Sequence, residues 1–111
     1  MKDFIKTFKQ LQLEAYNTAV EKGWWNKPKS TGENIALMHS ELSEALEAYR
    51  KGNPQSKKIP DYTEIEEELA DVIIRIMDFA GYKRWLNIPG AILAKMQYNK
   101  TRSYKHGGKK I

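Results

Sequence analysis

The chain has 111 residues, of which 19 are lysine or arginine, 14 are aspartate or glutamate, and none is cysteine. This length fits a single domain, residues 1–111. Without cysteine there are no disulfides or thiolate metal sites, and two histidines alone do not make a zinc site. Any metal would be held by carboxylates, which favours Mg²⁺ with Mn²⁺ as a substitute. We find no membrane-spanning run and no signal peptide, so we expect a cytoplasmic protein without a membrane partner.

The net charge is +5, and the two signs are unevenly distributed. Ten of the fourteen acidic residues lie between Glu41 and Asp78, and no acid follows Asp78. The segment from Lys95 onwards is basic. Two interpretations fit this pattern. The basic segment is an arm that grips nucleic acid, or it is a phosphate-binding segment that faces an acidic metal site.

The first half of the chain predicts two helices. Apolar residues at three- and four-residue spacing predict a helix over residues 2–22, which Gly23 ends. Residues 24–32 contain two adjacent tryptophans, a proline and a glycine, and are expected to form a loop. A second helix is expected over residues 33–50, with a capping box formed by Ser30 and Glu33. Its main apolar stripe consists of Ile35, Met38, Leu42, Ala45, Leu46 and Tyr49.

The second half predicts two further helices and a tail. After a polar loop over residues 55–60, a third helix is expected from Asp61 or Thr63 to Trp85, and its apolar centre predicts the most buried helix. The fourth covers residues 89–100, with Pro89 near its start. Residues 101–111 form a basic, extended tail. The fold class is therefore all-α, with a four-helix-bundle-like core that oligomerisation completes, because so short a chain buries only a modest core.

Two acidic pairs lie within these helices, Glu41 with Glu44 and Glu68 with Asp71. Residues three apart share a helix face, and Glu41 and Glu68 both border apolar residues. If the second and third helices pack antiparallel, all four carboxylates meet in one pocket, where their mutual repulsion requires a cation. The alternative is that they are ordinary surface acids. Outside the pocket, we expect four solvated acids: Glu47, Glu64, Glu66 and Glu67.

Three segments resemble the MazG-like nucleotide pyrophosphohydrolases, a family within the all-α NTP pyrophosphatases. Residues 39–47 (HSELSEALE) resemble the first family motif and residues 66–75 (EEELADVIIR) the second. The spacing Lys95-x-x-x-Asn99-x-x-Arg102 resembles the basic segment that follows. The resemblance implies a homodimer or homotetramer with sites near subunit interfaces. It also implies that Mg²⁺ is bound by four carboxylates, those of Glu41, Glu44, Glu68 and Asp71. The phosphates or the sugar would be contacted by Lys95, Asn99 and Arg102.

The resemblance implies a reaction that the residue types can support. A nucleoside triphosphate, expected to be a deoxynucleotide, is hydrolysed to the monophosphate and pyrophosphate as nucleotide-pool house-cleaning. Glu44 is our candidate for the general base that deprotonates the attacking water. Trp25 either stacks on the nucleotide base or caps the core.

Two other functions remain open from the sequence. One is a helical nucleic-acid-binding module with a basic C-terminal arm and no catalytic activity. Nucleic acid is the less favoured partner, because two acid pairs without metal would repel its phosphates. The other is a helical interaction protein, similar to an antitoxin, whose acidic site is vestigial.

Overall fold

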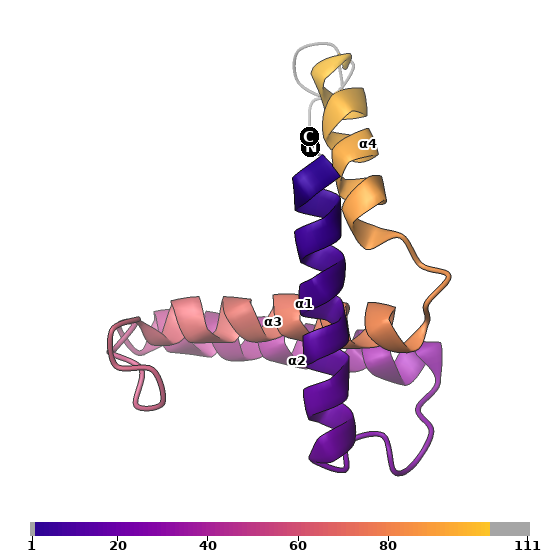
Figure 1. Ribbon diagram of the computed structural model, residues 1–111. Helices are drawn as coiled ribbons and strands as arrows, with labels where there is room; N and C mark the ends of the chain where they lie inside the picture. The colour runs from indigo at the N-terminus through magenta and orange to yellow at the C-terminus, as the bar shows by residue number, and fades with distance from the viewer. Residues whose placement is uncertain (1, 103–111) are drawn as a thin grey trace.

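The computed structural model describes residues 2–102 and is all-helical over this range, with four helices (Figure 1). They are α1 (Lys2–Glu21), α2 (Thr31–Arg50), α3 (Glu64–Tyr82) and α4 (Ile88–Lys100). Between residues 2 and 102 the only β-type pairing is an isolated bridge from Gln55 to Thr63. The prediction of an all-α chain is confirmed. The expected tail at 101–111 lies almost entirely outside the described residues.

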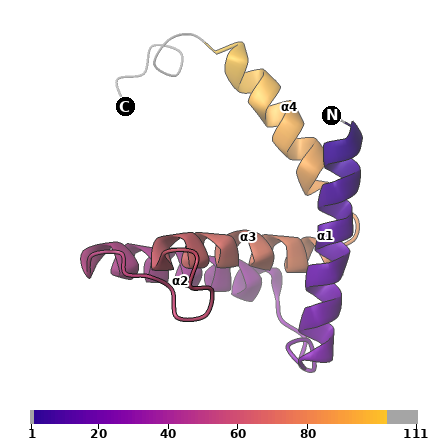
Figure 2. The same ribbon diagram turned by 60° about the vertical axis from the view of Figure 1, so that its left-hand side comes forward.

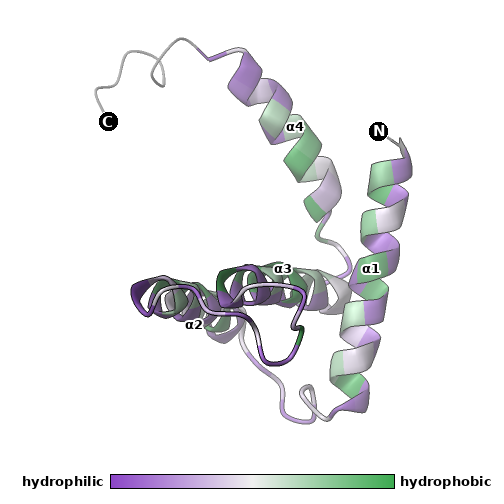
Figure 3. Cartoon of the chain, turned by 90° about the vertical axis from the view of Figure 1, so that its left-hand side faces the viewer, coloured by the Kyte–Doolittle hydropathy of each residue, from purple (hydrophilic) through white to green (hydrophobic). Residues whose placement is uncertain are grey.

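The α2–α3 hairpin is the centre of the arrangement. The two helices lie side by side and antiparallel, and α1 crosses them steeply while packing against α3 (Figures 1 and 2). Helix α4 lies beside the N-terminal half of α1 and stands apart from the hairpin. Both α4 and the hairpin carry apolar segments (Figure 3). The four helices thus do not enclose one common core within a single chain. None of the described helices is long and apolar enough to cross a membrane.

Capping residues set the starts of the two hairpin helices. The Ser30 hydroxyl accepts from the Glu33 amide at 3.0 Å, and the Glu33 carboxylate accepts from the Ser30 amide at 3.0 Å, so the predicted capping box is confirmed. Thr63 and Glu66 form a second capping box at the start of α3. The predicted end of α3 was wrong: the helix ends at Tyr82, and the next residues form a turn instead of continuing to Trp85.

The buried core is small and is built largely from alanine. Its apolar members are Phe8, Ala19, Ala45, Ala48 and Ala80. The expectation that α3 is the most buried helix is confirmed: most of its residues are at least partly buried, whereas most residues of α1, α2 and α4 are exposed. Several large apolar side chains of the hairpin stay about half exposed or more, and we call five of them the apolar face: Leu42 (47%), Leu46 (51%), Tyr49 (68%), Leu69 (43%) and Ile73 (50%).

Helix α1 crosses α3 at Gly81. A Cβ atom there would lie 2.7 Å from Tyr16 Cβ and 2.9 Å from the Gln12 carbonyl oxygen, so the crossing requires glycine.

We expect Gly81→Ala to destabilise the fold by about 1–3 kcal/mol through overpacking, despite alanine's higher helix propensity. Urea unfolding checks this value. Gly32→Ala, where nothing lies closer than 3.8 Å, is the control and should be neutral or slightly stabilising. Equal stabilities of the two variants would contradict the argument.

Candidate functional site

The α2–α3 hairpin brings both acidic pairs into one cavity of about 390 Å³, which we call the acidic cavity. Glu41 and Glu44 come from α2, and Glu68 and Asp71 come from α3. The antiparallel packing of the two helices therefore joins the four carboxylates that the sequence singled out. The remaining lining residues are Trp24, Lys58, Ile74 and Arg75.

The carboxylates are close enough to share a cation. One oxygen each from Glu41, Glu44 and Glu68 lie within 4.8 Å of one another, and the same holds for Glu67, Glu68 and Asp71. Glu68 belongs to both groups, and its Oε2 atom is buried without a hydrogen-bond partner among the described residues. A buried carboxylate oxygen without a donor is costly, and a hard divalent cation would satisfy it. The residues present thus fit a magnesium ion.

Arg75 lies among the acids as an internal cation. Its Nε donates to Glu41 Oε1 at 2.8 Å, and both side chains are largely buried, 25% exposed for Arg75 and 12% for Glu41. Removing either member of such a pair would leave an uncompensated charge. Arg75 also lies over the Trp24 ring, 5.8 Å from its centroid. It therefore connects the acids to the loop that follows α1.

The charges of the cavity shift the pKa values in opposite directions. Burial, together with the neighbouring carboxyls of Glu44, Asp71 and Glu67, raises the pKa of Glu68 to about 7. Burial also raises the pKa of Asp71, and the charge of Glu41 adds to this effect. For Glu41, burial acts upwards as well. However, its hydrogen bonds, above all the one from Arg75, and the charge of Arg75 outweigh burial and lower its pKa.

These shifts predict how stability depends on pH without metal. A carboxyl whose pKa is raised in the folded state destabilises the fold as pH rises from its unfolded value of 4.5 through about 7. The lowered pKa of Glu41 stabilises the folded state by a constant amount above pH 5, because this stabilisation is lost only when Glu41 is protonated at lower pH. We therefore expect the Tm in EDTA to fall between pH 5 and 8, and millimolar Mg²⁺ to restore it increasingly at higher pH. A Tm that rises over this range in EDTA would contradict the expectation.

A second cavity of about 350 Å³ adjoins the first and is mainly apolar. We call it the apolar cavity. It lies between α1 and the C-terminal half of α3, and it shares Trp24, Ile74 and Arg75 with the acidic cavity. The other lining residues are Leu11, Glu14, Ala15, Thr18, Ala19, Lys22, Met77 and Asp78. The two cavities together offer one ligand an acidic compartment and an apolar one.

The two tryptophans differ in position. Trp24 is 53% exposed and lines both cavities. Trp25 lines neither cavity: its ring stacks on Tyr82 with centroids 4.2 Å apart, and its Nε1 donates to Asp78 at 2.8 Å. The sequence left two roles open for Trp25, stacking on a nucleotide base and capping the core. Its observed contacts are packing contacts. Trp24 is the tryptophan that lines the cavities where a ligand could bind.

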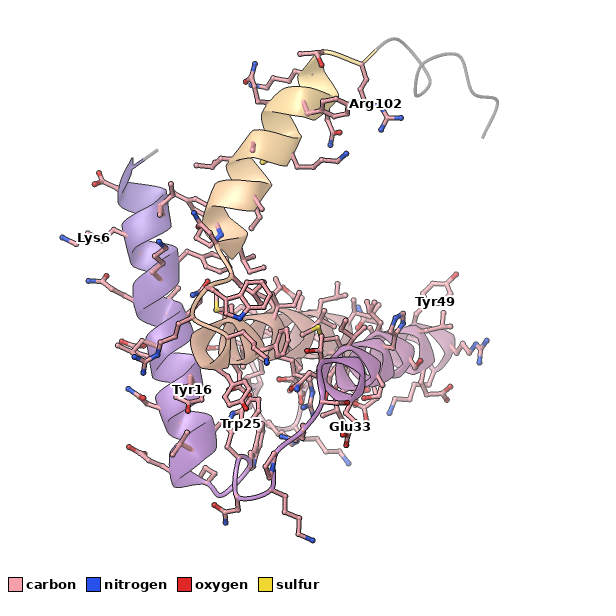
Figure 4. The ribbon with its side chains drawn as sticks, turned by 90° about the vertical axis from the view of Figure 1, so that its right-hand side faces the viewer. Lys6, Tyr16, Trp25, Glu33, Tyr49 and Arg102 are labelled. Atoms are coloured by element: carbon pink, nitrogen blue, oxygen red, sulfur yellow. The ribbon has the colours of Figure 1, made fainter. Side chains whose placement is uncertain are left out.

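The basic segment of α4 is not brought to the acids within one chain. Lys95 and Asn99 lie in the C-terminal half of α4, and Arg102 lies two residues past its end. This end of α4 points away from the hairpin (Figures 2 and 4). Lys95 and Arg102 instead lie over the Tyr98 ring, 4.7 and 5.9 Å from its centroid. The expected juxtaposition of the acidic and basic segments is therefore not formed inside one chain.

Four lining residues of the acidic cavity were not among the predicted site residues: Trp24, Lys58, Ile74 and Arg75. Arg75 lies four residues after Asp71, and this helical spacing was an available signal. Lys58 belongs to a loop whose path the sequence does not predict. The prediction that Glu64 and Glu67 are solvated was wrong. The Glu64 side chain is only 21% exposed and pairs with Lys51, and Glu67 is half-buried and accepts a hydrogen bond from Ser56.

Comparison with known proteins gives no identification. No family model matches the chain, and neither a curated protein nor a solved structure matches it significantly.

Proposed function

We propose that the chain is a magnesium-dependent pyrophosphohydrolase that converts a nucleoside triphosphate to its monophosphate and pyrophosphate. One observation carries the proposal: a cavity of four carboxylates, with one buried oxygen that has no partner among the described residues, adjoins an apolar cavity and shares Trp24 with it. A nucleotide has the matching two parts, a polyphosphate that binds with metal and a base that binds to apolar and aromatic groups. The MazG-like motifs in the sequence support the same assignment.

The residues of the acidic cavity have two roles in such a reaction, metal binding and proton transfer. Glu41, Glu44, Glu68 and Asp71 hold magnesium, which when bound neutralises phosphate charge and orients the phosphates. Glu44, the exposed member of the set, accepts a proton from the attacking water. The water oxygen forms a bond to the α-phosphorus, the bond from that phosphorus to the bridging oxygen breaks, and pyrophosphate leaves with the electron pair.

A second copy of the chain would complete the site. The side chains of the apolar face recur at three- and four-residue spacing along α2 and at four-residue spacing along α3, and large exposed apolar surfaces of this kind mark interaction sites. Covering it with another copy forms the homodimer or homotetramer that the sequence led us to expect. Because Lys95, Asn99 and Arg102 lie far from the acids of their own chain, we assign their phosphate contacts to the acidic cavity of a neighbouring copy.

The deciding experiment incubates the protein with a panel of ribo- and deoxynucleoside triphosphates in Mg²⁺, in Mn²⁺ and in EDTA. We expect metal-dependent release of pyrophosphate and monophosphate, with a deoxynucleotide preferred. Reaction in ¹⁸O-labelled water should place the label in the monophosphate, as attack on the α-phosphorus requires. No turnover of any nucleotide, together with salt-sensitive binding to DNA or RNA, would overturn the proposal in favour of the nucleic-acid-binding alternative.

A further inference from the structure

Lys58 enters the acidic cavity from the connection between α2 and α3. Among the residues that line this cavity, the cationic ones are Lys58 and Arg75. Arg75 is committed to Glu41 at 2.8 Å and is largely buried. Lys58 is different: its side chain is 84% exposed, and its Nζ lies 4.0 Å from Glu67 Oε2, the outer limit of an ion pair. Its ammonium group is therefore available to an anionic ligand.

The backbone that carries Lys58 is fixed by a buried serine. Ser56 is 1% exposed, and its hydroxyl accepts from the amides of Lys58 at 3.2 Å and Ile59 at 3.1 Å while donating to Glu67. The Ser56 amide also donates to the Tyr62 carbonyl at 2.9 Å. These bonds tie the loop to α3 next to the acids. A lysine on an anchored loop loses less conformational freedom on binding than one on a free loop.

The position of Lys58 along α3 gives the ligand a direction. The apolar cavity lies against α3 from Ile74 to Asp78, whereas Lys58 approaches α3 at Glu67. Ile74 lies seven residues after Glu67 on α3, which is a helical rise of about 10 Å. A nucleotide whose base occupies the apolar cavity would therefore place its α-phosphate near Ile74 and its terminal phosphates towards Lys58.

We propose that Lys58 is a substrate-binding residue whose ammonium group contacts the terminal phosphates, the part that leaves as pyrophosphate. This inference rests on the proposed function, because it assumes a polyphosphate in the acidic cavity. A triphosphate brings several negative charges into a site that already contains four carboxylates. The ammonium group of Lys58, at the far end of the cavity, balances negative charge of the phosphates that the metal does not neutralise.

The test compares Lys58→Ala with Lys57→Ala, since Lys57 is the exposed neighbour that does not line the cavity. Calorimetry measures binding of Mg²⁺ alone, of the magnesium complex of inorganic triphosphate, and of the nucleoside monophosphate that the wild type produces. We expect Lys58→Ala to weaken triphosphate binding roughly tenfold, with Mg²⁺ and monophosphate binding unchanged. Lys57→Ala should match the wild type, and Lys58→Arg should recover most of the affinity.

The outcomes separate this inference from the proposed function. If the wild type binds neither Mg²⁺ nor triphosphate, the proposed function fails and this inference fails with it. If the wild type binds both and Lys58→Ala matches Lys57→Ala, the inference about Lys58 is overturned while the proposed function stands. An equal loss of monophosphate and triphosphate binding would overturn the placement at the terminal phosphates. Matching thermal unfolding curves establish that both variants are folded.

Discussion

Glu68→Gln is expected to reduce pyrophosphate release by more than about 100-fold, because loss of even an outer partner of a metal site costs 10–100-fold. Glu68 belongs to both groups of converging carboxylates, so no other single substitution removes as much of the proposed metal site. Steady-state pyrophosphate release at saturating Mg²⁺ measures the effect. Unchanged release would contradict a ligand role for this residue.

The same substitution is expected to stabilise the metal-free protein. Glu68 is the carboxyl whose pKa burial and its neighbours raise to about 7, so at pH 8 its ionised form opposes folding. Glutamine keeps the shape and removes the charge. We expect a higher Tm than that of the wild type in EDTA at pH 8, a smaller difference at pH 5, and a smaller gain on adding Mg²⁺. The control is Glu47→Gln, an exposed acid outside the cavity, which should change neither activity nor Tm.

The double substitution Leu42→Glu and Leu46→Glu is expected to convert the proposed oligomer into monomers. Both side chains are about half exposed on the apolar face, and burying two carboxylates against a second copy costs far more than the apolar contact returns. Light scattering behind size-exclusion chromatography measures the mass. Ser43→Glu, which adds a charge at an exposed polar position of the same helix, is the control and should leave the mass unchanged.

Activity should fall with dissociation. If the basic residues of α4 act on the acidic cavity of a neighbouring copy, the monomeric variant loses them and its kcat/KM drops at least about tenfold. A monomeric wild type, or a double variant that keeps the wild-type mass, would contradict the proposed interface. A variant that is monomeric yet fully active would instead contradict the assignment of Lys95, Asn99 and Arg102 to a neighbouring site.

The sequence predicted the local structure well because local rules set it. Residue spacing gave the four helices, the Ser30–Glu33 pair gave the start of α2, and the three-residue spacing of each acidic pair placed its two carboxylates on one side of their helix. The antiparallel hairpin then followed from a short connection. These features depend on residues close together in the chain, whose side chains meet by helix geometry alone.

What the sequence left open depends on contacts between distant segments. The helical wheel identified an apolar stripe on α2 but not the partner that covers it, and two of its leucines, Leu42 and Leu46, are about half exposed. Two adjacent tryptophans look alike in a sequence, yet only the crossing of α1 over α3 determines that Trp25 packs on Tyr82 while Trp24 faces the cavities. The loop that carries Lys58 follows a path set by a buried serine, for which no periodic pattern exists.

The shared wall at Trp24 separates two functions that can change independently. In the proposed assignment, residues of α1 on the far side of this wall, such as Leu11, Ala15 and Thr18, meet the base, while the carboxylates on the near side carry out the chemistry. If the proposed function holds, substitutions on α1 would redirect the chain to another nucleotide without disturbing the proposed metal ligands. Such a division would let chains with this architecture diverge in the nucleotide they remove while keeping one reaction, and it marks α1 as the helix to randomise when altering specificity.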